Sequence, residues 1–265
     1  MIYRNGEWID SNSVDELQFK DSLTLYEVIR VFKGVPVFIE DNFSRLVSSL
    51  SKANANIDIE SIRFKEKIAE FVLKNQMNEG NIKYLISFPN SNNLNANYIE
   101  YIFQIPHKYP TAKQYECGVA VSKLNKERIN PEIKYLNIDF REYTNGLIKE
   151  RNVYELLLIN ADHQITEGSK SNIFFIKDGV LYTSPDNLVL GGTARKRVIE
   201  LAGRLGIKVI KSVMYEAELS EYDAAFITGT SPLVLPISDI DEYKFDVTNS
   251  TLRLIMESYF KMILV

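Results

Sequence analysis

The chain of 265 residues is 45% hydrophobic and 25% charged, a composition typical of a globular protein that buries a large core. Its formal net charge is -4 and its Lys and Arg residues are scattered, which argues against nucleic acid as a partner. No apolar run has bilayer length, the first residues lack a signal-type segment, and one Cys with two distant His residues does not suit a metal site. These features favour a cytoplasmic enzyme that acts on small molecules, with no membrane partner and no metal.

The first half of the chain predicts an α+β arrangement. Apolar and polar residues alternate as in a strand, and a Lys-Gly pair turns that strand back on itself. Asp41 is the expected N-cap of the helix that follows. The predicted elements, in chain order, are a strand at residues 25–32, its hairpin partner at 35–39, helices from Asp41 and at about 62–74, and strands near 82–88 and 98–105.

Residues 106–110 contain two prolines and no periodicity, so we place a domain boundary there. The expected domains are an N-terminal α+β domain at residues 1–110 and a C-terminal domain at residues 111–265. Gly206 is the predicted stop of one C-terminal helix, and Thr248 the predicted cap of the last helix. The predicted C-terminal elements are strands near 119–124, 155–160, 173–177, 180–183, 207–214 and 224–228, and helices near 140–151, 194–205 and 248–262.

Glu167 stands among small residues between two apolar runs. The Asp178-Gly179 pair further along predicts a two-residue hairpin turn, so Glu167 is expected at the inner end of a strand. An unpaired charge is costly to bury there, and a cation should therefore meet the carboxylate. On the pattern alone, a surface turn after a strand is an equal alternative.

Six short motifs occur in this order: Tyr26-Glu27-Val28-Ile29-Arg30, Arg45-Leu46, Lys134-Tyr135-Leu136-Asn137, residues 166–172, Gly192-Thr193-Ala194-Arg195 and Thr228-Gly229-Thr230-Ser231. Together they resemble the motifs of the class IV (fold-type IV) pyridoxal-phosphate enzymes. This family includes branched-chain aminotransferases, D-amino-acid aminotransferases and aminodeoxychorismate lyase, and the resemblance covers about residues 26–239. It implies a two-domain α/β (α+β) fold with a smaller N-terminal domain and a larger C-terminal pseudo-barrel, pyridoxal 5'-phosphate as cofactor, and a homodimer.

The resemblance implies that Lys134 forms a Schiff base with the cofactor and then moves the Cα proton of the substrate as general base and acid. Glu167 would pair with the pyridine nitrogen, which supplies the cation that its burial demands. Tyr26 would line the substrate side, although an aromatic residue in an alternating strand is more often a core residue. Lys149 and Lys170 are the competing lysines, but Lys149 falls within a helix and Lys170 occupies a variable position of the family pattern.

The cofactor phosphate needs several donors. By resemblance, Arg45 would clamp it with a bidentate guanidinium, and the helix start at Thr193 and Ala194 would offer backbone N–H groups. Thr230 would add a donor from a loop after a strand. A surface ion pair with Asp41 is the alternative role of Arg45, and Thr193 could also serve as a structural cap.

Three departures from the family pattern affect the substrate side or the phosphate site. Residues 19–25 replace a glycine-rich segment of the relatives, and the loop at residues 89–97 lacks the Arg-x-His carboxylate trap of the D-amino-acid enzymes. Thr193-Ala194 stands where the relatives carry Ile-Thr, which removes one side-chain bond to the phosphate. Neither D-amino-acid specificity nor a branched-chain pocket is therefore supported.

Three functions are consistent with these residues. The leading one is a pyridoxal-phosphate-dependent aminotransferase that moves an amino group between an amino acid and a 2-keto acid. The second is an aminodeoxychorismate lyase, in which Lys134 would assist the elimination of pyruvate. The third is a cofactor-binding protein without activity. Amino transfer that depends on a keto acid would favour the first function, and pyruvate release without an acceptor would favour the second.

Overall fold

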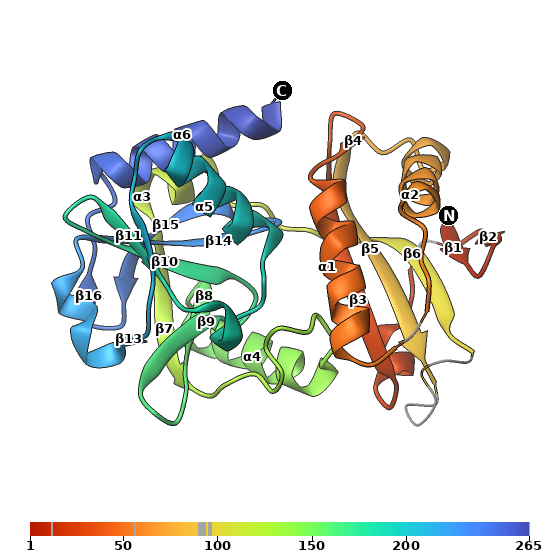
Figure 1. Cartoon of the computed structure of the whole chain (residues 1–265), viewed down its shortest axis with the longest axis horizontal. Helices are drawn as coiled ribbons and strands as arrows, with labels where there is room; N and C mark the ends of the chain where they lie inside the picture. Colours follow the sequence, from red (N-terminus) through yellow and green to blue (C-terminus); the bar gives the residue numbers. More distant parts are fainter. Residues whose placement is uncertain (12, 56, 90–93, 95–96, 265) are drawn as a thin grey trace. The chain divides into compact units, whose positions relative to one another are not determined.

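The computed structural model describes residues 1–264 except 12, 56, 90–93, 95 and 96, so most of the loop at 89–97 lies outside the described residues. The chain forms two compact units (Figure 1): Met1–Lys108 with Ile133–Ile138, and Tyr109–Glu132 with the residues from Asp139 onward. The sequence pattern assigns residues 133–138 to the C-terminal domain. They pack with the first unit instead, because their backbone pairs with one of its strands.

The first unit is an antiparallel sheet of six strands with two helices against one face. The strand order is β2-β1-β6-β5-β3-β4. The strands are β1 (Ile2–Arg4), β2 (Glu7–Ile9), β3 (Leu23–Phe32), β4 (Val35–Pro36), β5 (Glu79–Phe88) and β6 (Ile99–Ile105). A 3-10 helix η1 (Glu16–Phe19) precedes β3, and the α-helices are α1 (Ile39–Lys52) and α2 (Ser61–Lys74).

Both faces of this sheet are apolar. Alternate residues of β3, such as Leu25 and Ile29, share one core with residues of α1 and α2 such as Leu46 and Phe71. On the other face a smaller core contains residues of η1, β5 and β6 and the chain around Leu136. Side chains on the two faces of β3 therefore have different surroundings, as the period of two along a strand requires.

Helix α1 begins earlier than the sequence predicts. Asp41 is not its N-cap but lies in its first turn, where a carboxylate interacts favourably with the helix dipole. The N-cap is Phe38, which has a φ of 55° and makes no side-chain capping bond. This left-handed residue turns the chain directly into the helix, so the returning strand β4 is only two residues long.

The second unit is built on one large mixed sheet, in the order β12-β11-β10-β14-β15-β7-β8-β9-β13 with β16 on β15. The strands are β7 (Val119–Asn125), β8 (Glu155–Ile159), β9 (Gln164–Gly168), β10 (Asn172–Lys177), β11 (Val180–Thr183), β12 (Val209–Lys211), β13 (Met214–Tyr215), β14 (Ala224–Gly229), β15 (Leu233–Ile240) and β16 (Tyr243–Lys244). The helices are α3 (Ala112–Cys117), α4 (Ile138–Arg151), η2 (Asp186–Leu188), α5 (Thr193–Arg204), η3 (Glu216–Glu221) and α6 (Ser250–Leu264).

This sheet curls around a single core. Strands far apart in its order contribute to that core, for example β9 through Ile165 and β10 through Phe175, which a flat sheet could not achieve. On the outer face, Phe174 and Phe226 stack with ring centroids 5.0 Å apart. Helices α5 and α6 pack over β14 on this side (Figure 1). The curled sheet matches the predicted pseudo-barrel.

Predictions from local sequence were confirmed where one or two residues determine the backbone conformation. Asp178 and Gly179 have φ values of 52° and 73° and close the predicted hairpin, with Lys177 opposite Val180. Gly206, with a φ of 72°, ends α5 as predicted. The Gly206 amide bonds the Gly203 carbonyl at 3.2 Å and the next amide bonds the Ala202 carbonyl at 2.9 Å, which is a Schellman arrangement.

Two other sequence predictions were wrong. Thr248 does not cap the last helix, because its hydroxyl donates to Asp246 Oδ1 at 2.6 Å. The cap is Asn249, whose Oδ1 accepts from the amides of Thr251 and Leu252 at 3.1 and 3.2 Å. Strand β15 was missed because Pro236 lies within it, and proline is rare inside a sheet.

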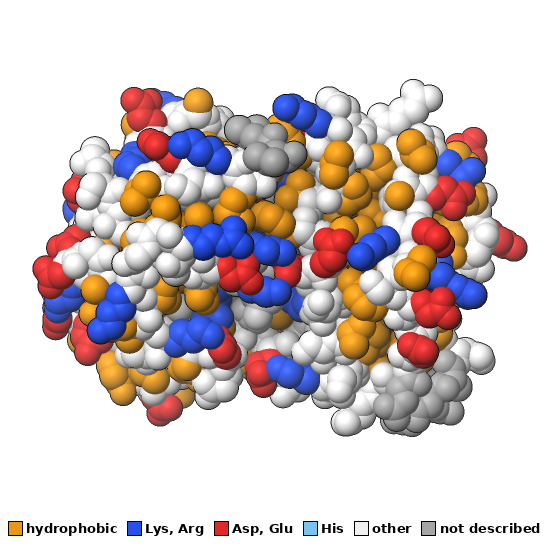
Figure 2. Space-filling model, turned by 45° about the horizontal axis from the view of Figure 1, so that its top comes forward, with side chains coloured by type: hydrophobic (Ala, Val, Ile, Leu, Met, Phe, Trp, Pro, Cys, Tyr) orange, Lys and Arg blue, Asp and Glu red, His pale blue; other side chains and the backbone are white. Residues whose placement is uncertain are grey.

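Charge is mixed on the surface. On the face drawn in Figure 2, Lys and Arg side chains alternate with Asp and Glu side chains, with no stripe of one sign. Such an arrangement fits the small formal net charge of -4. Among the described helices, none combines the length and the hydropathy needed to cross a bilayer.

Candidate active site

The residues singled out from the sequence fall into two groups. The first unit carries Tyr26, Arg45 and Lys134, and the second carries Glu167, Thr193, Ala194 and Thr230. In the first unit, backbone pairing brings Tyr26 and Lys134 together. In the second unit, hydrogen bonds of Asn172 and Leu190 connect Glu167 with the segment before α5. The prediction that both groups bind one ligand stays a prediction.

Lys134 is fixed against the edge of β3 by its backbone. Its carbonyl accepts a bond from the Tyr26 amide at 3.1 Å, and its own amide donates to Ser49 Oγ at 3.2 Å. The neighbouring Leu136 amide bonds the Thr24 carbonyl at 2.7 Å. β4 pairs with this edge of β3 only at its far end, so the edge is open to the Lys134 segment.

The competing lysines have ordinary surroundings. Lys149 is exposed on α4, and Lys170 is exposed with its Nζ donating to Asn145 Oδ1. Lys134, by contrast, is half-buried, and its Nζ lies 4.6 Å from the centroid of the Tyr26 ring. Lys134 is therefore the candidate of the three whose amine is held against an aromatic wall.

Tyr26 contacts a second ammonium group. Lys83 on β5 is 1% exposed, its Nζ lies 5.0 Å from the same ring centroid, and it forms an ion pair with Glu16 Oε1 at 2.5 Å. Tyr26 is thus not a simple core residue. Sequence reasoning missed Lys83 because a lysine in an alternating strand is expected on the solvent side.

Arg45 binds a buried carboxylate that the sequence did not identify. Its Nε and Nη2 donate to Glu27 Oε1 and Oε2 at 2.8 and 2.5 Å, and Asn42 Nδ2 donates to Oε2 at 2.8 Å. Burial by itself lowers the pKa of Arg45, but the charge and hydrogen bonds of Glu27 outweigh it and the pKa is raised. The alternative role of Arg45 was a surface ion pair with Asp41, but the carboxylate that it binds is the buried Glu27.

Arg45 and Lys134 contact opposite faces of β3. Arg45 binds Glu27, whereas Lys134 lies over Tyr26. Consecutive residues of a strand point to opposite sides of the sheet. The structure therefore brings both side chains to the same short stretch of β3.

Glu167 lies in β9 and is 2% exposed, which excludes the surface-turn alternative. A cation does meet it, because Arg128 Nη1 donates to Oε1 at 3.2 Å. Asn172 Nδ2 and the Leu190 amide donate to Oε2 at 3.1 and 3.0 Å. Arg128 was missed because it lies in an irregular segment with no motif. Three donors thus orient both carboxylate oxygens.

Asn172 connects Glu167 to the start of α5. Its Nδ2 also donates to the Leu190 carbonyl at 2.9 Å. A Cβ added at Gly192 would overlap Asn172 Oδ1, so glycine is needed for this close approach. Gly192 is the N-cap of α5 and has no side chain to cap it, while Thr193 and Ala194 are 7% and 3% exposed.

The second unit therefore offers the groups that pyridoxal 5'-phosphate requires. A buried, oriented carboxylate can accept a bond from a protonated ring nitrogen. The helix start buries amide N–H groups without a side-chain cap, which is the arrangement that binds phosphate in many proteins. Thr230 follows β14, the strand that pairs with the strand of Asn172. The donor set fits the cofactor.

Glu155 holds the loop that follows Glu167. It is 3% exposed on β8 and accepts four hydrogen bonds. Three come from the loop after β9: from the Ser169 and Ser171 hydroxyls at 2.5 and 2.8 Å and from the Lys170 amide at 3.2 Å. The fourth comes from the amide of the next residue at 2.8 Å. No sequence signal marked Glu155, because its partners are distant in the chain.

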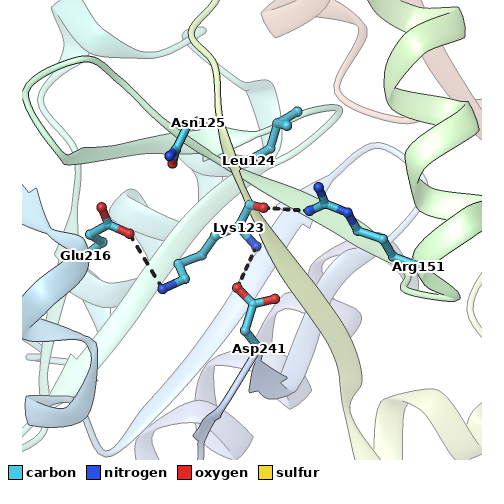
Figure 3. Close-up of a pocket in the computed structure, with 6 residues that line it drawn as sticks. All are labelled: Lys123, Leu124, Asn125, Arg151, Glu216 and Asp241. Carbon is cyan, nitrogen blue, oxygen red and sulfur yellow. Dashed lines mark hydrogen bonds and ion pairs between the residues drawn. The ribbon is translucent and has the colours of Figure 1, made fainter.

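A separate cavity of about 440 Å³ contains none of the predicted residues (Figure 3). Its charged groups are paired with one another and with the backbone. Lys123 Nζ lies 3.6 Å from Glu216 Oε2, the Lys123 amide donates to Asp241 Oδ2 at 3.1 Å, and Arg151 Nη1 donates to the Lys123 carbonyl at 2.7 Å. A bond from His163 is the main reason that the pKa of Glu216 is lowered.

Comparison with known proteins identifies the family. The family model of Amino-transferase class IV matches residues 24–240. A D-alanine aminotransferase of Listeria monocytogenes is 30% identical over 240 residues, which are 84% of this chain and 80% of the relative. A Thermotoga maritima protein with the provisional name branched-chain-amino-acid aminotransferase is 30% identical over 256 residues, 92% of this chain and 89% of the relative.

Solved structures share the fold. The branched-chain amino acid aminotransferase of Escherichia coli superposes with a TM-score of 0.84 at 21% identity and covers 98% of this chain and 93% of its own. A Legionella pneumophila protein with the provisional name 4-amino-4-deoxychorismate lyase gives a TM-score of 0.80 at 19% identity, with 96% of both chains covered. At such low identity these similarities concern the fold alone.

The contacts of Glu155 predict the effect of replacing it. Glu155→Gln keeps the size but replaces one acceptor oxygen with an NH2 donor that faces other donors, so we expect the free energy of unfolding to fall by about 2 kcal/mol. Urea denaturation measures this change, and amide hydrogen exchange at residues 169–171 should quicken. Glu150→Gln, an exposed glutamate on α4, is the matched control. Equal stability of the two variants would contradict the role of Glu155.

Proposed function

The chain belongs to the Amino-transferase class IV family, and we propose that it moves an amino group between an amino acid and a 2-keto acid through Lys134. Pyridoxal 5'-phosphate is the cofactor of this family. When bound, it accepts the electron pair that remains on the substrate Cα after the proton leaves. The observation that carries the assignment of the site is the buried Glu167 carboxylate, oriented by three donors.

Glu167 is proposed to accept a hydrogen bond from the ring nitrogen. A carboxylate that accepts bonds from Arg128, Asn172 and the Leu190 amide is chemically suited to the ionised state. That negative charge would keep a pyridine nitrogen protonated. Arg128 would also prevent the buried carboxylate from being unpaired before the cofactor binds.

Lys134 is proposed to bind the cofactor covalently and to move the proton at the substrate Cα. Its backbone makes two hydrogen bonds, one with Tyr26 at the edge of β3 and one with Ser49 on α1, so the position of its backbone is fixed. The Tyr26 ring beside Nζ would form one wall and limit access of water. These contacts support Lys134 as the positioned amine.

The phosphate is proposed to bind at the start of α5, through the amides of Thr193 and Ala194, with Thr230 nearby. For Arg45 we propose a contact through Nη1, because Nε and Nη2 already bind Glu27. A guanidinium can bind one carboxylate and still donate to a second anion, since it carries five N–H groups.

An aminodeoxychorismate lyase remains the second candidate function, because a protein with that provisional name has the same fold. The amino-transfer function is better supported, since the two relatives described above, each 30% identical over most of the chain, are named as aminotransferases. Their names differ in the amino acid, D-alanine in one and branched-chain amino acids in the other. The names of the relatives therefore do not decide which amino acid this chain uses.

The role of Lys134 leads to a mapping experiment. Borohydride reduction of the protein with bound pyridoxal 5'-phosphate, followed by peptide mapping, should find the label on Lys134. Lys134→Ala should lower amino transfer by about 10²-fold or more, because it removes the group that moves the proton. Lys149→Ala is the control and should retain activity. A label on Lys149 or Lys170 would sink the assignment.

Substrate requirements distinguish amino transfer from the lyase reaction and from cofactor binding without activity. With cofactor, an amino acid and a 2-keto acid, we expect a new amino acid and a new keto acid in equal amounts, and no product when either substrate is omitted. Pyruvate release from aminodeoxychorismate without any keto acid would favour the lyase. A bound-cofactor spectrum that no amino acid changes would favour a binding protein without activity.

We also propose that the chain forms a homodimer in the cytoplasm. Ile62 and Leu73 are 71% and 76% exposed and lie on the same side of α2, eleven residues apart, which supports association of copies. The exposed thiol of Cys117 suits a reducing compartment. Sedimentation should give twice the chain mass of 30.5 kDa, and cell fractionation tests the location. A monomer at working concentrations would contradict the dimer.

A further inference from the structure

Thr228 carries a buried hydroxyl without a partner. The residue lies in β14 and is 0% exposed, and its Oγ1 makes no hydrogen bond to any described residue. Buried hydroxyl groups nearly always have a partner, because leaving one unsatisfied is costly. We therefore expect a bound group that is not part of the chain to form a hydrogen bond with Thr228 Oγ1.

The register of the sheet shows where this hydroxyl points. Thr228 lies directly opposite Asn172 in the antiparallel pair of β14 and β10, and opposite residues of such a pair point to the same face. Asn172 bonds the Leu190 carbonyl and touches Gly192. The Thr228 side chain therefore faces the loop that leads into α5.

Neighbouring side chains support this direction. Phe226, two residues before Thr228, stacks on Phe174 on the outer face of the sheet, and α5 packs over β14. Ile227, between them, belongs to the core inside the curled sheet. Because the strand alternates, Thr228 shares the outer face with Phe226. On that face, Thr228 lies at the end of β14 that is nearer to the start of α5.

The first backbone amides of α5 need a hydrogen-bond acceptor. The helix has 12 residues, and its N-cap Gly192 supplies no side-chain bond to the first amides. Thr193 and Ala194 are buried, so water has poor access to those amides. Ala194 also has no side-chain donor, which means that the helix start offers a ligand only its backbone and the Thr193 hydroxyl. A hydroxyl from β14 would add a donor from the opposite side.

We propose that Thr228 Oγ1 donates a hydrogen bond to the phosphate of pyridoxal 5'-phosphate, opposite the amides of Thr193 and Ala194. This inference rests on the proposed function, since it requires that the cofactor binds at the start of α5. It assigns Thr228 in addition to Thr230, which the motif singled out. Thr230 is half-buried in the turn beyond the strand, whereas Thr228 is fixed within it. The phosphate completes the contact that the chain leaves open.

The proposal predicts opposite effects on stability and on binding. Thr228→Val keeps the shape and removes only the hydroxyl, so the protein without cofactor should be as stable as the wild type or more stable. The dissociation constant for pyridoxal 5'-phosphate, measured by absorbance titration, should rise roughly 10-fold or more, because a bond to a charged group is lost. Thr228→Ser retains the hydroxyl and should bind nearly as the wild type does.

A ligand without the phosphate separates this role from a general effect on the site. Pyridoxal should bind Thr228→Val and wild type equally, since it lacks the group that Thr228 contacts. Thr144→Val is the matched control, because Thr144 is 1% exposed and its hydroxyl is satisfied by the Phe140 carbonyl at 2.9 Å. That variant should lose stability and keep its affinity for the cofactor.

The outcomes are distinguishable. An unchanged dissociation constant of Thr228→Val for pyridoxal 5'-phosphate, or an equal weakening for pyridoxal, overturns the role of Thr228 and leaves the proposed function intact. A stability loss without a binding loss points to a structural water as the partner and also overturns it. Failure of the wild type to bind the cofactor overturns the proposed function, and this inference with it.

Discussion

The burial of the Glu167 carboxylate is the constraint on which the second unit depends. A charge that is 2% exposed must be satisfied on both oxygens. The chain does this with Arg128, Asn172 and the Leu190 amide, which come from three separate segments. Because Asn172 also bonds the loop before α5, the same carboxylate is linked to the start of that helix. The proposed ring-nitrogen acceptor and the proposed phosphate site are thereby connected by hydrogen bonds.

A second buried carboxylate, Glu155, stabilises the loop that follows the strand of Glu167. Its four hydrogen bonds restrain the loop at residues 169–171, which joins the strand of Glu167 to the strand of Asn172. A fully satisfied polar network of this kind is rigid, and a partly satisfied one would be costly. The unit therefore carries a preorganised polar site between two apolar layers, which is the condition for electrostatic catalysis in a low-dielectric setting.

In the first unit, β3 carries two different polar contacts on its two faces. Tyr26 faces the amines of Lys83 and Lys134, and Glu27 faces the guanidinium of Arg45. Period-two alternation makes this separation unavoidable for consecutive residues. A single strand edge thus orients an amine on one side and a guanidinium on the other, while the backbone of the Lys134 segment extends the sheet.

The sequence by itself determined the features that depend on short-range chemistry. The Asp178-Gly179 hairpin and the Gly206 stop were predicted from residues within a few positions of one another. For Glu167 the pattern left a surface turn as an equal alternative, and the structure shows that it is buried. The end caps Asp41 and Thr248 were wrong, because other nearby groups competed for the same role. Only the tertiary structure decided the partners of the buried charges. Arg128 is 39 positions from Glu167, and Lys83 is 67 positions from Glu16; such pairs form through the packing of distant strands and loops, which leaves no periodic signal in the sequence.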